Sequence, residues 1–193
     1  MVLTFVKQFE RNVYMSREIW DAYDKDGNKL GFDQFRDELI PEGVYHIVVE
    51  IYTVTENNEV LITKRHQSKP WAVLKWEITV GSILKGETPE QGAIRELKEE
   101  TGIEVTDSDL NFVYSYICKN IPSIYKCFVV LINKEKTRIQ LQEEETIDYR
   151  YLPYSEFKQF IKTDDYVDWV SERFYIHEKL FDKMIIEVRN HKL

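Results

Sequence analysis

Apolar residues gather in short runs along the chain, and polar turn residues separate one run from the next. Runs of this length that are rich in β-branched and aromatic residues predict strands. The run at 44–54 is the longest and mostly apolar, so we expect a buried strand that turns at Asn57-Asn58 into its neighbour. We predict strands at residues 44–54, 60–64, 76–80, 111–118, 126–132 and 147–152.

A helical pattern follows the third of these runs. Thr88 is suited to cap the helix, and Gln91, three residues later, completes a capping box. Pro89 stands at the first helical position, where a missing N–H costs nothing. Gly102 suits the left-handed conformation in which helices often end. We therefore predict one helix from about Pro89 to Thr101.

The C-terminal part of the chain, from 154 to 193, is also predicted to be helical. Tyr166, Trp169 and Phe174 belong to an apolar stripe at helical spacing. Such a stripe either covers a core or contacts a partner protein. We favour core cover.

Asp26-Gly27 is a hairpin turn signal near the N-terminus. Asp24 and Asp26 also resemble the start of a calcium-binding loop. Lys29, however, stands where that loop needs glycine, and Phe35 stands where it needs glutamate. A β-hairpin is therefore the better interpretation of this segment.

A chain of 193 residues fits one domain with a substantial core. The first 14 residues fit that domain least well, and Met15 would be a natural start. We expect residues 1–14 to be an N-terminal extension. Residues 15–193 are then a single domain that includes the hairpin and the helical C-terminus.

Composition and charge exclude several classes of function. The chain is 43% apolar and 31% charged, with a net charge of −8, so we expect no binding of a nucleic-acid polymer, which needs a basic face. No apolar run reaches the roughly 20 residues that cross a membrane, and no secretory leader is evident. We expect a cytoplasmic protein.

The cysteines and histidines indicate no metal centre of their own. Cys118 and Cys127 lie in two predicted strands without a CxxC pattern, so buried thiols are favoured over a disulfide between neighbouring strands. The histidines lack metal-ligand spacing, and a structural role is preferred for each of them: His46, His66, His177 and His191.

The strongest chemical signal is a set of three carboxylates, Glu96, Glu99 and Glu100, in the last turns of the predicted helix. Negative charge is unfavourable there, because the helix C-terminus is the negative end of the macrodipole. Glu96 and Glu100 also repel each other at i,i+4 spacing. A divalent cation, which prefers carboxylate oxygens, would compensate both effects. The alternative is a solvated acidic face, with Arg95 pairing to Glu99 or to Glu87.

A rival phosphate-binding motif fails in the same region. Gly81 and Gly86 have the glycine spacing of a P-loop, which should continue with lysine. Glu87 stands in that position instead, and a carboxylate cannot contact phosphate oxygens directly. The dinucleotide fingerprint G-x-G-x-x-G does not occur in the chain either.

Residues 81–103 resemble the signature of the Nudix hydrolase family at every specified position, and both gaps have the right length. The matching residues are Gly81, Glu87, Arg95, Glu96, Leu97, Glu99, Glu100, Gly102 and Ile103. The resemblance implies an α/β fold, namely an α/β/α sandwich with a mixed sheet and a loop–helix–loop catalytic motif. It also implies a Mg²⁺- or Mn²⁺-dependent hydrolase that cleaves a diphosphate linkage in a nucleoside diphosphate derivative or a related small molecule.

The resemblance assigns the metal to Glu96, Glu99 and Glu100. Glu99 is the candidate general base, and Arg95 and Glu87 complete the candidate catalytic set. Glu145 is a candidate fourth metal ligand, because it precedes a predicted strand as the family's additional glutamate does. The alternative for Glu145 is a solvated acidic turn.

Substrate contacts are less constrained by the sequence. Arg65 and Lys69 follow a predicted strand, where they would hold substrate phosphate, although ordinary surface positions are the alternative. Aromatic residues would stack on a base or belong to the core, and the candidates are Tyr52, Trp71, Trp76 and Tyr116. The sequence leaves open the substrate and the assembly, although Nudix proteins often form homodimers.

Two other functions remain as alternatives. The region before residue 81 resembles the Nudix subgroup related to isopentenyl-diphosphate isomerase. Those isomerases carry a cysteine in a Cys-x-His context and a degenerate signature, whereas residues 79–83 contain neither residue and the signature is intact. A non-catalytic ligand-binding Nudix module usually lacks signature glutamates, and none is missing here. Both comparisons favour hydrolysis.

Overall fold

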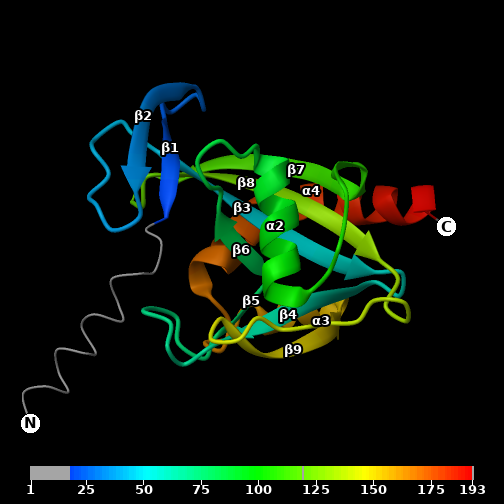
Figure 1. Cartoon of the computed structure of the whole chain (residues 1–193). Helices are drawn as coiled ribbons and strands as arrows, with labels where there is room; N and C mark the ends of the chain where they lie inside the picture. The colour runs from blue at the N-terminus through cyan, green and yellow to red at the C-terminus, as the bar shows by residue number, and fades with distance from the viewer. Residues whose placement is uncertain (1–17, 119, 193) are drawn as a thin grey trace, which may run out of the picture.

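The computed structural model describes residues 18–118 and 120–192 (Figure 1). The expected extension at 1–14 and the domain start at Met15 lie outside these residues. The strands are β1 (Ile19–Tyr23), β2 (Lys29–Phe35), β3 (His46–Thr55), β4 (Glu59–Arg65), β5 (Trp76–Glu77), β6 (Thr79–Ser82), β7 (Leu110–Cys118), β8 (Ser123–Ile132) and β9 (Thr146–Pro153). The helices are α2 (Pro89–Thr101), the short 3-10 helix η2 (Asp107–Asp109), α3 (Tyr154–Phe160) and α4 (Asp168–Lys192).

A mixed sheet of seven strands forms the centre of the molecule. Its main order is β5-β4-β3-β8-β7, with β6 paired to β3 and β9 paired to β4. β3 and β8 run parallel, whereas the other pairs are antiparallel. Every residue of β3 is buried, as expected for a central strand covered on both faces.

Helices cover both faces of this sheet. Ile47, Val49 and Ile51 of β3 pack in one core cluster with residues of α2. Tyr52 and Val54 pack in the other cluster, with residues of α3 and α4. Alternate residues of a strand point to opposite faces, so one strand supplies both cores. The predicted α/β/α sandwich is therefore confirmed.

The structure corrects two predicted elements. The run at 76–80 is not one strand, because β5 pairs with β4 while β6 pairs with β3. The C-terminal part forms two helices, α3 and α4, separated by residues 161–167. The buried face of α4 includes Phe174, Phe181 and Ile185, which confirms that the apolar stripe covers the core.

The N-terminal hairpin and the free thiols are as predicted. β1 and β2 pair antiparallel, and the turn between them contains Gly27 with φ of 82°. Cys118 and Cys127 are both free, but only Cys127 is buried as predicted, whereas Cys118 is partly exposed. The register of β7 and β8 places Cys118 opposite Ser123, so the two thiols are not cross-strand partners. Within the described ranges, no helix is long and apolar enough to cross a membrane.

Candidate active site

Helix α2 begins and ends where its sequence predicts. Thr88 accepts a hydrogen bond from the Gln91 backbone N–H, and the Gln91 side chain accepts one from the Thr88 backbone N–H. Gly102 has φ of 73° and donates its N–H to the Lys98 carbonyl. These local contacts fix the helix in register, and they determine which face carries the carboxylates.

Arg95 connects three of the predicted site carboxylates. Its Nε and Nη2 donate to the two oxygens of Glu87 at 2.8 and 2.9 Å. Its Nη1 donates to Glu96 at 2.8 Å and to Glu99 at 3.0 Å. Nη2 also donates to the Ser82 carbonyl at 3.0 Å, which ties the helix to the end of β6. Arg95 therefore pairs with both Glu87 and Glu99, the two partners that the sequence left open.

Glycine at position 81 permits the close approach of Glu96 to the sheet. A Cβ atom built on Gly81 would overlap the carboxyl group of Glu96. Any other residue at this position would push the Glu96 side chain away from β6. The first glycine of the signature therefore has a steric explanation in this structure.

Buried carboxylates accumulate under the C-terminal half of α2. Glu100 is partly buried, and burial together with the nearby charges of Glu77 and Glu96 raises its pKa well above the usual range, although Thr79 and Lys69 oppose the shift. Burial also raises the pKa of Glu96, although Arg95 opposes the shift. Glu77 is 5% exposed, and its Oε2 has no hydrogen-bond partner.

Glu77 was missed by the sequence analysis. Its signal was a charged residue inside an apolar run, where burial without a partner is expensive. The partner is Arg65, the last residue of β4, which pairs with β5. Burial raises the pKa of Glu77, and the charge of Arg65 offsets this shift only in part.

Arg65 and Lys69 have other partners than the expected phosphate. Arg65 is 6% exposed, forms an ion pair with Glu77, and lies 3.8 Å from the ring centroid of Trp71. Lys69 forms an ion pair with Glu145, which is 37% exposed. The guanidinium of Arg65 is therefore held by Glu77 and the Trp71 ring, whereas the ammonium of Lys69 lies at the edge of the cluster.

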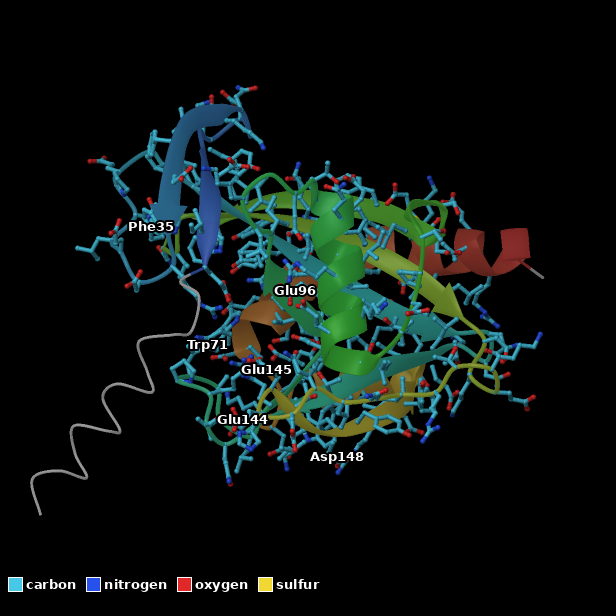
Figure 2. The ribbon with its side chains drawn as sticks, viewed as in Figure 1. Phe35, Trp71, Glu96, Glu144, Glu145 and Asp148 are labelled. Carbon is cyan, nitrogen blue, oxygen red and sulfur yellow. The ribbon has the colours of Figure 1, made fainter. Side chains whose placement is uncertain are left out.

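Two loops bring Glu145 to this region. The His66 backbone N–H donates to the Glu145 carbonyl at 2.8 Å, and Ser68 Oγ donates to the Glu144 carbonyl at 3.2 Å. Figure 2 shows Glu96 on α2 above Trp71 and Glu145, which come from these two loops. The loop after β4 and the loop before β9 thus form one side of the site.

The charges of this cluster do not balance. Among the described residues, Arg65, Lys69 and Arg95 form the ion pairs of a cluster with six carboxyl groups, so three of the six would lack a cation if all were ionised. The carboxylates are Glu77, Glu87, Glu96, Glu99, Glu100 and Glu145. No three Asp, Glu, His or Cys side chains of the described residues form a metal-ligand group. Arg95 forms ion pairs with Glu87, Glu96 and Glu99, and Lys69 forms one with Glu145. The excess charge fits a divalent cation.

A hollow of about 680 Å³ adjoins this cluster on the side of Glu99. Its lining is mostly polar and comes from the end of α2 and from the loop before β9, and it comprises Lys98, Glu99, Gly102, Glu104 and residues 140–143. The charged residues of this lining are Lys98, Glu99, Glu104 and Glu143, so the hollow has a net negative charge and is not suited to an anionic phosphate.

The aromatic candidates separate into core and surface. Tyr52 and Trp76 are 2% and 3% exposed and belong to the core. Tyr116 is partly buried against the same core. Trp71 is 43% exposed, and its ring contacts Trp169 of α4 at 5.1 Å between centroids. Of the four, only Trp71 presents a large part of its ring outside the protein.

Comparison with known proteins identifies the family of this fold and site. The sequence model of the NUDIX domain matches residues 44–172, which is more than half of the chain. The chain belongs to the Nudix family. The family resemblance of residues 81–103 and the expected enzyme class, a Nudix-type pyrophosphohydrolase, are therefore confirmed.

This Nudix protein is similar in sequence to other proteins and similar in fold to solved structures. An uncharacterized Nudix hydrolase of Listeria monocytogenes is 28% identical over 153 residues, which cover 79% of this chain and 89% of that protein. An isopentenyl-diphosphate Delta-isomerase of Salmonella heidelberg is 31% identical over 124 residues, covering 61% and 66%. A crystal structure of a Deinococcus radiodurans protein matches with a TM-score of 0.68 at 17% identity, over 83% of this chain and 99% of that one.

Proposed function

We propose that this Nudix protein hydrolyses a diphosphate linkage in a small molecule, such as a nucleoside diphosphate derivative, with Mg²⁺ or Mn²⁺ as cofactor. The observation that carries the proposal is a cluster of six carboxyl groups on α2 and its neighbouring loops and strand, which form ion pairs with three cations among the described residues. Burial and neighbouring carboxylates raise the pKa values of Glu77, Glu96 and Glu100, so their ionised forms are unfavourable without a further cation, which indicates a function that uses one.

Glu96, Glu99 and Glu100 would hold the cation, with Glu145 as an additional ligand. When bound, a divalent cation neutralises the diphosphate oxygens and makes water a better nucleophile. Glu99 is 47% exposed and keeps one hydrogen bond from Arg95. It is therefore the carboxylate best placed to accept the proton of the attacking water.

Arg95 and Glu87 hold the reactive carboxylates in position. Two of the three donor nitrogens of Arg95 bind Glu87, so Nη1 is the nitrogen that reaches Glu96 and Glu99. This arrangement orients both carboxylates without neutralising them completely. General base catalysis by a carboxylate held in this way typically contributes about 10²–10⁴-fold.

We propose that Lys69 binds the substrate phosphate and that Arg65 has a structural role in the site. Lys69 faces Glu145, so a cation that binds Glu145 would free the ammonium for a phosphate oxygen. Arg65 is held by Glu77 and by the Trp71 ring, and its role is to neutralise part of the buried charge of Glu77.

Phosphate release from a panel of substrates tests this function. The panel comprises nucleoside diphosphate sugars, dinucleoside polyphosphates, nucleoside triphosphates and prenyl diphosphates, each with and without Mg²⁺. We expect Mg²⁺-dependent hydrolysis, with ¹⁸O from solvent water in a phosphate-containing product. Label in a product without phosphate would mean attack at carbon, and the proposed mechanism would be wrong.

Isomerisation of isopentenyl diphosphate is the second candidate, favoured by the isomerase relative at 31% identity. Residues 79–83 lack the cysteine and histidine of those isomerases, whereas the signature glutamates are all present. We expect no dimethylallyl diphosphate after incubation with isopentenyl diphosphate and Mg²⁺. Efficient formation of that isomer would overturn the hydrolase proposal.

A further inference from the structure

The β1–β2 hairpin contacts the loop that precedes α2, although it lies outside the matched domain at 44–172. Figure 1 shows the hairpin in blue beside the N-terminal end of α2. The Lys85 backbone N–H donates to the Ile19 carbonyl at 2.8 Å, and the Lys85 ammonium lies 2.7 Å from Asp33. The Gly86 backbone N–H donates to Asp21 Oδ2 at 2.9 Å.

Asp21 is built into this contact as a charged acceptor. Its side chain is 16% exposed, and Lys29 of β2 donates to the same oxygen at 2.6 Å. Burial opposes ionisation of Asp21, but the hydrogen bonds from Lys29 and Gly86 outweigh it and lower its pKa. A charged acceptor strengthens the bond to the Gly86 N–H. Gly86 has φ of 87°, a conformation that other residues rarely adopt.

The loop held in this way determines the position of Glu87. The Leu84 backbone N–H donates to Glu87 Oε2 at 2.7 Å, and the Glu87 N–H donates to the Leu84 carbonyl at 3.0 Å. Glu87 in turn binds two nitrogens of Arg95. The contact from the hairpin therefore reaches the catalytic carboxylates through three successive groups: the loop backbone, Glu87 and Arg95.

We propose that Asp21 is a positioning residue for the active site, which fixes the loop before α2 and thereby keeps Arg95 on Glu87. This inference rests on the proposed function. When the loop is fixed, only Nη1 of Arg95 competes with a cation for Glu96 and Glu99. When the loop is loose, Glu87 releases Arg95, and the guanidinium competes for these carboxylates with all its nitrogens.

A purely structural role of Asp21 in holding the hairpin makes a different prediction. Asp33 also connects the hairpin to the loop, through the Lys85 side chain, but it does not contact the loop backbone at Gly86. If hairpin attachment is all that matters, loss of Asp33 should act like loss of Asp21. If the Gly86 N–H matters, only Asp21 should affect the site.

The experiment compares Asp21→Ala with Asp21→Asn, Asp33→Ala and Lys29→Met in the full chain. Asn keeps an oxygen acceptor for the Gly86 N–H, and Lys29→Met keeps the carboxylate but removes the ion pair. The readouts are hydrogen exchange of the Gly86 amide by NMR, Mg²⁺ affinity by calorimetry, and kcat and KM with a substrate found in the panel. Thermal unfolding checks that each variant is folded, and Asp21→Leu replaces Asp21→Ala if the latter does not fold.

We expect Asp21→Ala to accelerate Gly86 exchange, to weaken Mg²⁺ binding severalfold and to lower kcat about tenfold with little change in KM. Asp21→Asn should retain most of the activity and Mg²⁺ affinity that Asp21→Ala loses. The two controls, Asp33→Ala and Lys29→Met, should behave like the wild type. Equal effects of Asp21→Ala and Asp33→Ala, or unchanged Mg²⁺ affinity in Asp21→Ala, would overturn the proposal. Failure of the proposed function would appear separately, as a wild-type protein that binds no Mg²⁺.

Discussion

Arg95 and Glu100 have opposite environments within one turn and a half of the same helix. Arg95 carries hydrogen bonds to three carboxylates, so the negative charges near it are partly compensated. Glu100 is partly buried beside Glu77 and Glu96, and this burial together with their like charges outweighs the opposing effects of Thr79 and Lys69 on its pKa. The uncompensated part of the cluster therefore lies at the C-terminal end of α2, where the helix dipole also disfavours negative charge.

Glu100→Gln should separate the stability of the metal-free protein from its function. We expect slight stabilisation, by a few tenths to about 1 kcal/mol, because the change removes a buried like-charge contact at a helix C-terminus. Mg²⁺-dependent turnover should be abolished. Thermal unfolding without Mg²⁺ and calorimetric titration with Mg²⁺ measure the two effects.

The matched control for this change is Glu104→Gln. Glu104 lies just beyond α2, is largely exposed and pairs with Lys98. Its replacement should change neither Mg²⁺ affinity nor turnover. Equal Mg²⁺ affinity in the wild type and in Glu100→Gln would remove Glu100 from the metal site.

Glu99→Gln tests the general base. Glutamine keeps the shape of the side chain and its hydrogen bond with Arg95 through the amide oxygen, but it cannot accept the proton of water. We expect kcat to fall by roughly 10²-fold or more, with a smaller effect on KM. If Glu99→Gln keeps near-wild-type turnover while Glu145→Gln loses it, the base is Glu145.

Among the elements, α4 is attached to the sheet by a buried ion pair. Glu50 in the middle of β3 is 0% exposed, accepts from Arg173 Nε at 2.8 Å, and accepts from the Tyr114 hydroxyl at 2.7 Å. Arg173 also stacks over the ring of Tyr125 at 3.7 Å. These contacts link β3, β7, β8 and α4 on the face opposite to α2.

Arg173→Met should destabilise the protein strongly, because it leaves the carboxylate of Glu50 buried without its cation. Loss of one partner of a buried pair typically costs about 3–5 kcal/mol. The double variant Glu50→Gln with Arg173→Met removes both charges and should recover a large part of that loss. Urea unfolding of the four proteins of this cycle measures the coupling, and additive losses would contradict it.

For the whole molecule, we expect the junction between the hairpin and the sheet to be sensitive to acid. His46 at the start of β3 stacks on Trp20 of β1 at 4.3 Å between ring centroids, and its Nδ1 lies 3.1 Å from the Pro122 carbonyl. Burial, reinforced by the charge of Arg36, lowers the pKa of His46 to about 4, although the Pro122 contact opposes the shift. The folded protein therefore favours the neutral ring.

A depressed histidine pKa makes the folded state less stable in acid. The stabilising contribution of neutral His46 is complete above its unfolded pKa of 6.5 and is lost as the pH falls through about 4. The linkage amounts to about 3 kcal/mol in total. His46→Gln has no titrating ring, so the unfolding free energy of wild type should fall more steeply between pH 6.5 and 4 than that of the variant. Parallel curves would contradict a buried neutral His46.

Local signals in the sequence were sufficient for much of this protein. The capping box at Thr88, the glycine at 102 and the spacing of Glu96, Glu99 and Glu100 fixed α2 and the face of its carboxylates. These contacts lie within a few residues of one another, so their geometry follows from the helix itself. The strands were also predicted to within a few residues, except where residues 76–80 divide between two partners.

Only the tertiary structure decided which distant residues complete the site. The pairing of Arg65 with Glu77, of Lys69 with Glu145 and of Asp21 with Gly86 joins segments 12, 76 and 65 residues apart. No periodicity or spacing encodes such pairs, because they depend on which strands become neighbours and which loops meet at the sheet edge. The local sequence of α2 therefore determined which carboxylates are available for chemistry. The packing of the loops and the hairpin determined which residues pair with those carboxylates or position them.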